Sequence, residues 1–114
     1  MTETRMISLP AGTFRILEAG RAGDPLVILL HGFPETADAW GGLMPGLAGT
    51  GRHVVALDQR GYNLGPKPRG AAVYRLDELA GDVLDLADHL GAERFALVGH
   101  DWGASVTWWT ATRH

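Results

Sequence analysis

Three short runs of apolar residues, at positions 26–30, 54–57 and 95–98, do not alternate with polar residues. A strand with one face in water alternates, whereas a strand that is covered on both faces reads as a continuous apolar run. Segment 76–90 has apolar residues at helical spacing and ends at Gly91, a residue type that commonly follows the last turn of a helix. Strands that alternate with helices predict an α/β fold with a mostly parallel sheet.

The remaining segments have weaker patterns. Two β-prone segments, 7–9 and 13–17, flank a Pro-Ala-Gly turn and predict an N-terminal β-hairpin. Segment 36–48 is only weakly helical because glycines and a proline interrupt it, so we expect a short or broken helix. Segment 58–73 is a long loop rich in Gly and Pro, which indicates one side of a functional site. Segment 104–113 predicts a last helix.

Composition limits both the size of the fold and its partners. With 114 residues, 46% of them hydrophobic, the chain predicts at most one globular domain. A net charge of -3 and the lack of a basic stripe argue against a nucleic-acid partner. No apolar run approaches the roughly 20 residues that cross a membrane. The sequence has no cysteine and no secretory signal, which predicts a cytoplasmic protein, and it predicts no cofactor or metal site.

An aspartate stands between two glycines directly after the third apolar run, in the sequence Gly-His-Asp101-Trp-Gly. In a G-x-S-x-G turn, glycines let the backbone fold tightly and lift a nucleophile clear of the sheet. A carboxylate at that position is already ionised near pH 7, so it can attack an electrophilic carbon and form an ester. The start of the following helix favours the negative charge. The alternative on this local pattern is that Asp101 only caps that helix.

A second turn, His31-Gly-Phe-Pro34, directly follows the first apolar run. A hydrolase with a G-x-S-x-G turn keeps its oxyanion-hole loop at this place. The backbone N–H groups of Phe33 and Trp102 would then hold the oxyanion that forms when water attacks the ester. The alternative is a Gly-Pro turn with a packed histidine.

Three motifs together resemble those of the α/β-hydrolase family, most closely its soluble epoxide hydrolases. They are HGFPE at 31–35, DQRGYNL at 58–64 and VGHDWGA at 98–104, in the order and spacing of the family. The resemblance implies that Asp101 opens a small epoxide to a diol through a covalent ester. It also implies a cis bond between Phe33 and Pro34.

The same resemblance implies roles for the neighbours of Asp101. The backbone N–H groups of Phe33 and Trp102 form the oxyanion hole, and both residues line the substrate pocket. Structural roles in the two turns fall to His31, Gly32, Pro34, Gly99, His100 and Gly103.

Members of this family are about twice as long or longer, and they place a helical cap, an acid and the catalytic histidine beyond the region that is matched here. The resemblance therefore implies that residues 1–114 are a single partial core domain, the N-terminal portion of an α/β-hydrolase fold truncated after the helix that follows Asp101. Without that histidine we expect the chain to stop at the ester. The outer edge of strand 95–98 is then unpaired and available for association.

Two other functions stay open. Haloalkane and haloacetate dehalogenases share the aspartate nucleophile and the fold, and act on alkyl halides. Many haloalkane dehalogenases bind the halide with an Asn at the position of Phe33 or with a Trp of the cap. The Phe33 side chain has no donor, so this residue favours epoxides, whereas a Trp in a cap would favour halides. The second alternative is a non-catalytic fragment or interaction module that pairs through the open edge, because no histidine in the chain is a convincing base. One departure from the family's motifs, Gly65 and Pro66 in place of Ser-Asp, concerns the loop only.

Overall fold

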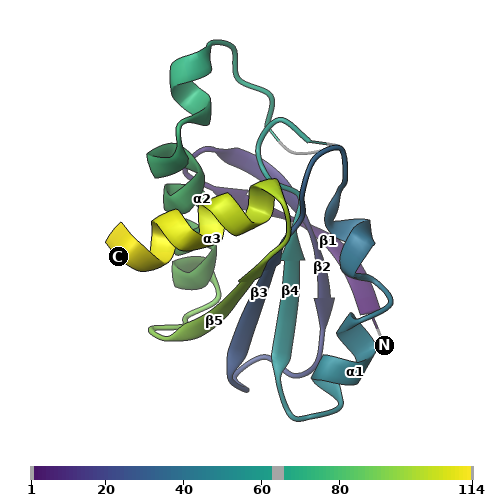
Figure 1. Ribbon diagram of the computed structural model, residues 1–114. Coiled ribbons are helices and arrows are strands. Elements are labelled where there is room, and N and C mark those ends of the chain that lie inside the picture. The colour runs from purple at the N-terminus through teal and green to yellow at the C-terminus, as the bar shows by residue number, and fades with distance from the viewer. Residues whose placement is uncertain (1, 63–65, 114) are drawn as a thin grey trace.

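The computed structural model describes residues 2–62 and 66–113, so motif residues 63 and 64 and Gly65 lie outside it. It contains one five-stranded sheet in the order β1-β2-β4-β3-β5 (Figure 1). The strands are β1 (Thr2–Leu9), β2 (Gly12–Ala19), β3 (Leu26–Leu30), β4 (His53–Leu57) and β5 (Phe95–Gly99). Strands β4, β3 and β5 are parallel, and β1 and β2 form an antiparallel hairpin, which confirms the predicted α/β fold.

The hairpin strands are longer than the predicted 7–9 and 13–17, with Thr2 opposite Ala19 at the outer end. Sequence periodicity missed these residues because most of the N-terminal half of β1 is exposed and polar. Such residues are held by ladder hydrogen bonds, which leave no hydrophobic signal in the sequence.

Helices cover both faces of the sheet. Helices α2 (Leu76–His89) and α3 (Trp102–Arg113) lie together on one face (Figure 1). The 3-10 helix η1 (Ala37–Trp40) and helix α1 (Met44–Ala48) lie on the other face, and a further 3-10 helix, η2 (Ala71–Tyr74), precedes α2. The break between η1 and α1 confirms the expected broken helix. Helix α3 begins two residues before the predicted start at 104, because the sharp turn at Asp101 leaves only two residues between β5 and the helix.

The two central strands, β3 and β4, are buried along their whole length, as the continuous apolar runs predicted. Their side chains point alternately to the two faces, so each strand contributes to two separate apolar clusters. Full burial of one Leu, Ile or Val side chain stabilises a fold by about 1.5–3 kcal/mol. The strand ends that carry the candidate site therefore emerge from a rigid centre.

The long loop after β4 is anchored by two ion pairs. Arg60 donates to both carboxylate oxygens of Asp82 in α2 at 2.7 Å, and also to the carbonyl of Val73 at 2.7 Å. Arg15 of β2 donates to Asp58 at 2.6 Å. Both pairs are largely buried and hold the start of the loop against the sheet and α2, while the bond from Arg60 to Val73 ties in its end.

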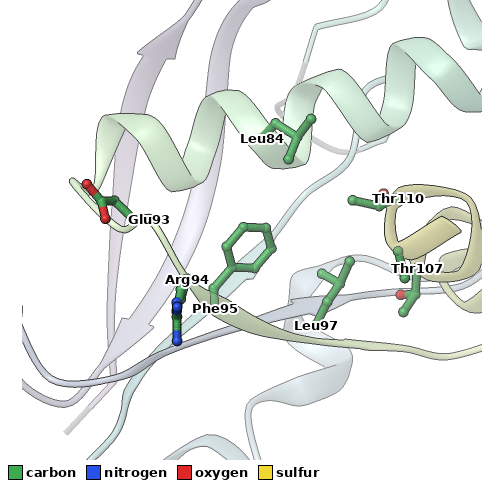
Figure 2. A pocket seen from close by; sticks show the side chains of 8 residues that line it. Leu84, Glu93, Arg94, Phe95, Leu97, Thr107 and Thr110 are labelled. Carbon is green, nitrogen blue, oxygen red and sulfur yellow. The ribbon is translucent and has the colours of Figure 1, made fainter. Parts of the chain in front are cut away.

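Strand β5 is an edge of the described sheet, with its only described partner strand on the β3 side. A groove of about 600 Å³ lies along it, between α2 and α3. Figure 2 shows Phe95 and Leu97 of β5 in this groove, below Leu84 of α2 and beside Thr107 of α3. The open edge expected from the sequence is therefore present in this structure.

Within the described residues, no helix has the length and apolar character that crossing a membrane requires.

Candidate functional site

The candidate site lies where the parallel strands β3 and β5 end. These strands pair directly, with Leu30 opposite Gly99, although β4 lies between them in the sequence. The segments that follow them therefore start at the same edge of the sheet, and the amide of His100 donates to the carbonyl of Leu30 at 3.2 Å. This pairing places the 31–35 loop against Asp101, far along the chain.

Asp101 stands at a sharp turn between β5 and α3. Its φ angle of 56° lies in the left-handed region, which residues with a side chain seldom adopt. A Cβ at Gly99 would collide with the carbonyl of Gly103 and the hydroxyl of Thr107, and a Cβ at Gly103 would collide with the carbonyl of Leu30. The two glycines therefore let the turn press against its neighbours, while the Asp101 side chain is exposed at the corner.

Backbone N–H groups hold the Asp101 carboxylate. The amide of Phe33 donates to Oδ2 at 3.1 Å across the site. This bond, together with the neighbouring amide of Trp102, holds the pKa of Asp101 below its usual value, because amide N–H groups near the carboxylate favour its charged form. Of the two amides that the sequence predicts as an oxyanion hole, that of Phe33 is thus hydrogen-bonded to Asp101 and that of Trp102 is its neighbour in the chain.

The alternative role of Asp101 as a helix cap can be compared with these contacts. A capping side chain accepts from the second or third amide of its helix. In α3, the amide of Gly103 donates to the carbonyl of His100 at 2.9 Å, and the amide of Ala104 donates to the Asp101 carbonyl at 3.0 Å. Backbone carbonyls therefore satisfy these amides, and the Asp101 carboxylate faces the 31–35 loop instead.

The 31–35 loop is braced by short internal bonds. The amide of Gly32 donates to Oε1 of Glu35 at 3.2 Å, and the amide of Glu35 donates back to the carbonyl of Gly32 at 2.9 Å. The peptide bond between Phe33 and Pro34 is cis, which confirms the expectation. Both of these side chains are exposed.

The two histidines of the motifs have different surroundings. His31 is fully buried, and burial lowers the pKa of its imidazole. His100 is exposed, with Nδ1 3.4 Å from Oε1 of Glu35. Among the described residues, no histidine ring is hydrogen-bonded to the carboxylate of Asp101.

An open cavity of about 400 Å³ adjoins the carboxylate and is lined by Phe33, Tyr62, Asp101, Trp102 and Ser105. Phe33 and Trp102 were predicted to line it. Ser105 was missed, although it lies one helical turn after Asp101 and so shares its side of the helix. Tyr62 was missed because a loop residue has no periodic pattern. Burial and the nearby charge of Asp101 raise the pKa of Tyr62.

This arrangement combines an ionised carboxylate, two amide donors and an open, partly aromatic cavity. One carboxylate oxygen, Oδ2, is engaged by Phe33, and the exposed side chain can reach a small molecule in the cavity. Such a carboxylate can attack an electrophilic carbon directly. Amide donors at the same place suit a tetrahedral oxyanion on the carbon of that carboxyl group.

Comparison with known proteins gives a consistent result. A family profile described as "alpha/beta hydrolase fold" matches residues 25–114. The chain is 46% identical over 104 residues to epoxide hydrolase A of Mycobacterium tuberculosis, covering 91% of this chain and 32% of that protein. It is 53% identical over 90 residues to epoxide hydrolase B of the same organism, covering 79% of this chain and 25% of that protein.

Solved structures agree with these relatives. The crystal structure of epoxide hydrolase A from Mycobacterium thermoresistibile superposes with a TM-score of 0.94 at 43% identity, over 97% of this chain and 35% of that one. An epoxide hydrolase from an endophytic Streptomyces gives a TM-score of 0.92 at 35% identity, over 98% of this chain and 33% of that one. The chain thus spans about a third of the length of these proteins.

Proposed function

Because this chain belongs to the α/β-hydrolase fold family, we propose that it is the N-terminal part of an epoxide hydrolase-like enzyme with Asp101 as its nucleophile. The observation that carries this proposal is the contact between the Phe33 amide and the Asp101 carboxylate at the turn after β5. The relatives that share this region are named epoxide hydrolases, which supports an epoxide as the small-molecule substrate. Cytoplasmic location stays a prediction from the sequence.

In the first step, the Asp101 carboxylate attacks a carbon of the epoxide ring. Because Oδ2 accepts the Phe33 amide, Oδ1 is the oxygen with which we expect the attack to occur. A C–O bond forms to Oδ1, the ring C–O bond breaks, and the released alkoxide takes up a proton. The product is a hydroxyalkyl ester of Asp101.

In the second step, water attacks the ester carbonyl carbon of Asp101. The carbonyl oxygen becomes an oxyanion, and the amides of Phe33 and Trp102 are the donors that would stabilise it. Collapse of this intermediate breaks the bond to the alkyl oxygen, and the diol leaves with a proton while Asp101 returns to a carboxylate. The same amides thus serve the resting carboxylate and the intermediate.

Hydrolysis of the ester needs a base for the attacking water. Two of the described histidines are already engaged: His31 is buried against Gln59, and His53 contacts Glu18 at 2.5 Å. Since the relatives are about three times as long, we propose that 1–114 is a partial core domain and that cap and base come from residues outside this sequence. The 114-residue chain would then accumulate the ester.

The test is intact mass after incubation with styrene oxide. We expect an adduct equal to the whole epoxide, located on Asp101 by peptide mapping. The variant Asp101→Asn should form none, because a neutral amide is a poor nucleophile. Circular dichroism of both proteins controls for folding. A folded wild-type chain that forms no adduct would contradict the role of Asp101 as the nucleophile and favour the alternative that the chain is a non-catalytic fragment.

An alkyl halide in the same assay distinguishes dehalogenation. The adduct would then carry the alkyl group without the halogen, with release of free halide. We expect slower labelling than with the epoxide, because the Phe33 side chain offers no donor to the leaving halide. Faster labelling by the halide would instead favour a dehalogenase.

A further inference from the structure

We propose that Gln59 is a positioning residue for the candidate oxyanion hole. It holds His31 through both its backbone and its side chain, and His31 in turn aims the amide of Phe33 at Asp101. This inference rests on the proposed function, because that function gives the Phe33 amide its role. Gln59 lies outside the two turn motifs and does not touch Asp101.

The direction of the Phe33 amide is set by the peptide group that contains it. Phe33 is 70% exposed, so packing of its ring cannot hold the backbone at this position. The peptide unit between Gly32 and Phe33 is planar and trans, so its carbonyl and its N–H point in opposite directions. The Gly32 carbonyl lies 3.0 Å from Nδ1 of His31 and accepts the Glu35 amide at 2.9 Å. Bonds to this carbonyl therefore direct the N–H toward Asp101.

The proton on the His31 ring is placed by the backbone of Gln59. The amide of Gln59 donates to Nε2 of His31 at 3.1 Å, so Nε2 must be the unprotonated nitrogen. The proton then lies on Nδ1 and is donated to the Gly32 carbonyl. Burial lowers the pKa of the ring, which favours its neutral form, and Tyr62 packs edge-on with ring centroids 4.6 Å apart. Only this one tautomer fits both contacts.

The side chain of Gln59 fixes the peptide group between His31 and Gly32, which precedes the one that contains the Phe33 amide. Its Nε2 donates to the carbonyl of His31 at 2.9 Å, and the Gln59 side chain is almost fully buried. The N–H of that same peptide group belongs to Gly32 and donates to Oε1 of Glu35. Gln59 therefore acts on two consecutive peptide groups that lead to the Phe33 amide, one directly and one through the His31 ring.

Gln59 is itself held rigidly at the end of β4. The preceding residue, Asp58, is fully buried and accepts hydrogen bonds from Arg15 of β2 and from the amide of Ala37 at 2.7 Å. Gln59, which holds the 31–35 loop through His31, is thus fixed to the central sheet.

The test is nuclear magnetic resonance of the 114-residue chain during a pH titration. In the wild type, we expect the Phe33 amide signal to follow the titration of the Asp101 carboxyl carbon. In Gln59→Met, which keeps length, volume and the backbone amide but removes the side-chain donor to the His31 carbonyl, the response of the Phe33 amide should weaken. The pKa of Asp101 should also rise toward its ordinary value. Thr110→Val removes a different buried hydrogen bond, from Thr110 to the Val106 carbonyl, and should change neither signal.

The outcomes separate positioning from simple stabilisation. If Gln59→Met lowers the melting temperature as Thr110→Val does but leaves the Phe33 response intact, the proposal is wrong. The wild type alone offers a second test, because ¹⁵N shifts of the His31 ring should show the Nδ1–H tautomer from pH 7 to 9. An Nε2–H tautomer or a charged ring in that range would overturn the positioning proposal. A wild type that forms no epoxide adduct, but whose Phe33 response weakens in Gln59→Met and not in Thr110→Val, would reject the proposed function while supporting the positioning role.

Discussion

Asp101 has a pKa below that of an ordinary aspartate, because the Phe33 amide donates to its carboxylate and the Trp102 amide is close to it. A lowered pKa means that the reactive form is lost only as the pH falls below the ordinary value of about 3.9. We therefore expect the rate of adduct formation to stay constant from pH 8 to about pH 5. Rates measured by mass spectrometry at fixed times check this. A decline that begins above pH 5 would contradict the direction of the shift.

Gly103 is one of the two glycines at which the turn tolerates no side chain. A Cβ there would meet the carbonyl of Leu30 in β3, a backbone atom that cannot swing away. We expect Gly103→Ala to destabilise the fold by about 1–3 kcal/mol, the usual cost of overpacking. It should also slow adduct formation, because the turn that presents Asp101 must shift.

Gly81 provides the matched control for this substitution. It lies inside α2, and a Cβ there would meet no atom within 4 Å. Gly81→Ala should therefore stabilise the helix, by up to about 1 kcal/mol. Urea unfolding of both variants measures the difference, and equal stability of the two would contradict the packing argument.

At the scale of elements, one buried ion pair joins the loop after β4 to α2. Removal of Asp82 would leave the Arg60 guanidinium buried without its carboxylate. Breaking such a pair from one side costs about 3–5 kcal/mol, so Asp82→Ala should greatly lower the urea midpoint. The exposed Asp88 on the same helix is the control, and Asp88→Ala should change stability little. Similar losses in both variants would show that the pair is not what anchors the loop.

At the scale of the whole molecule, the sheet has an open edge at β5. Unpaired amide and carbonyl groups on an edge strand favour pairing with another chain, and a charged residue on such a strand opposes it. We expect the 114-residue chain to associate as its concentration rises, and Ala96→Lys to stay monomeric, since Ala96 is exposed on β5. Light scattering after size-exclusion chromatography checks both. A wild type that stays monomeric at high concentration would contradict association through this edge.

Much of the fold was predictable because burial leaves a direct trace in sequence. The runs 26–30 and 54–57 are apolar without alternation because both faces of the sheet are covered. Helix α2 was predicted from its apolar spacing, and it ends at His89, one residue before the predicted end. The spacing of glycines around Asp101 reflected a turn in which a Cβ would collide with backbone atoms. These are local effects, so neighbouring residues carry them.

The arrangement of the candidate site was decided by tertiary structure. Phe33 and Asp101 are 68 positions apart and meet because β3 pairs with β5 on one side and with β4 on the other. Gln59 reaches His31 for the same reason, across adjacent strand ends. Contacts between single polar residues in loops follow no period, so sequence periodicity does not predict them. The sequence by itself determined the elements and the turn that carries Asp101, and strand order decided which amides reach its carboxylate.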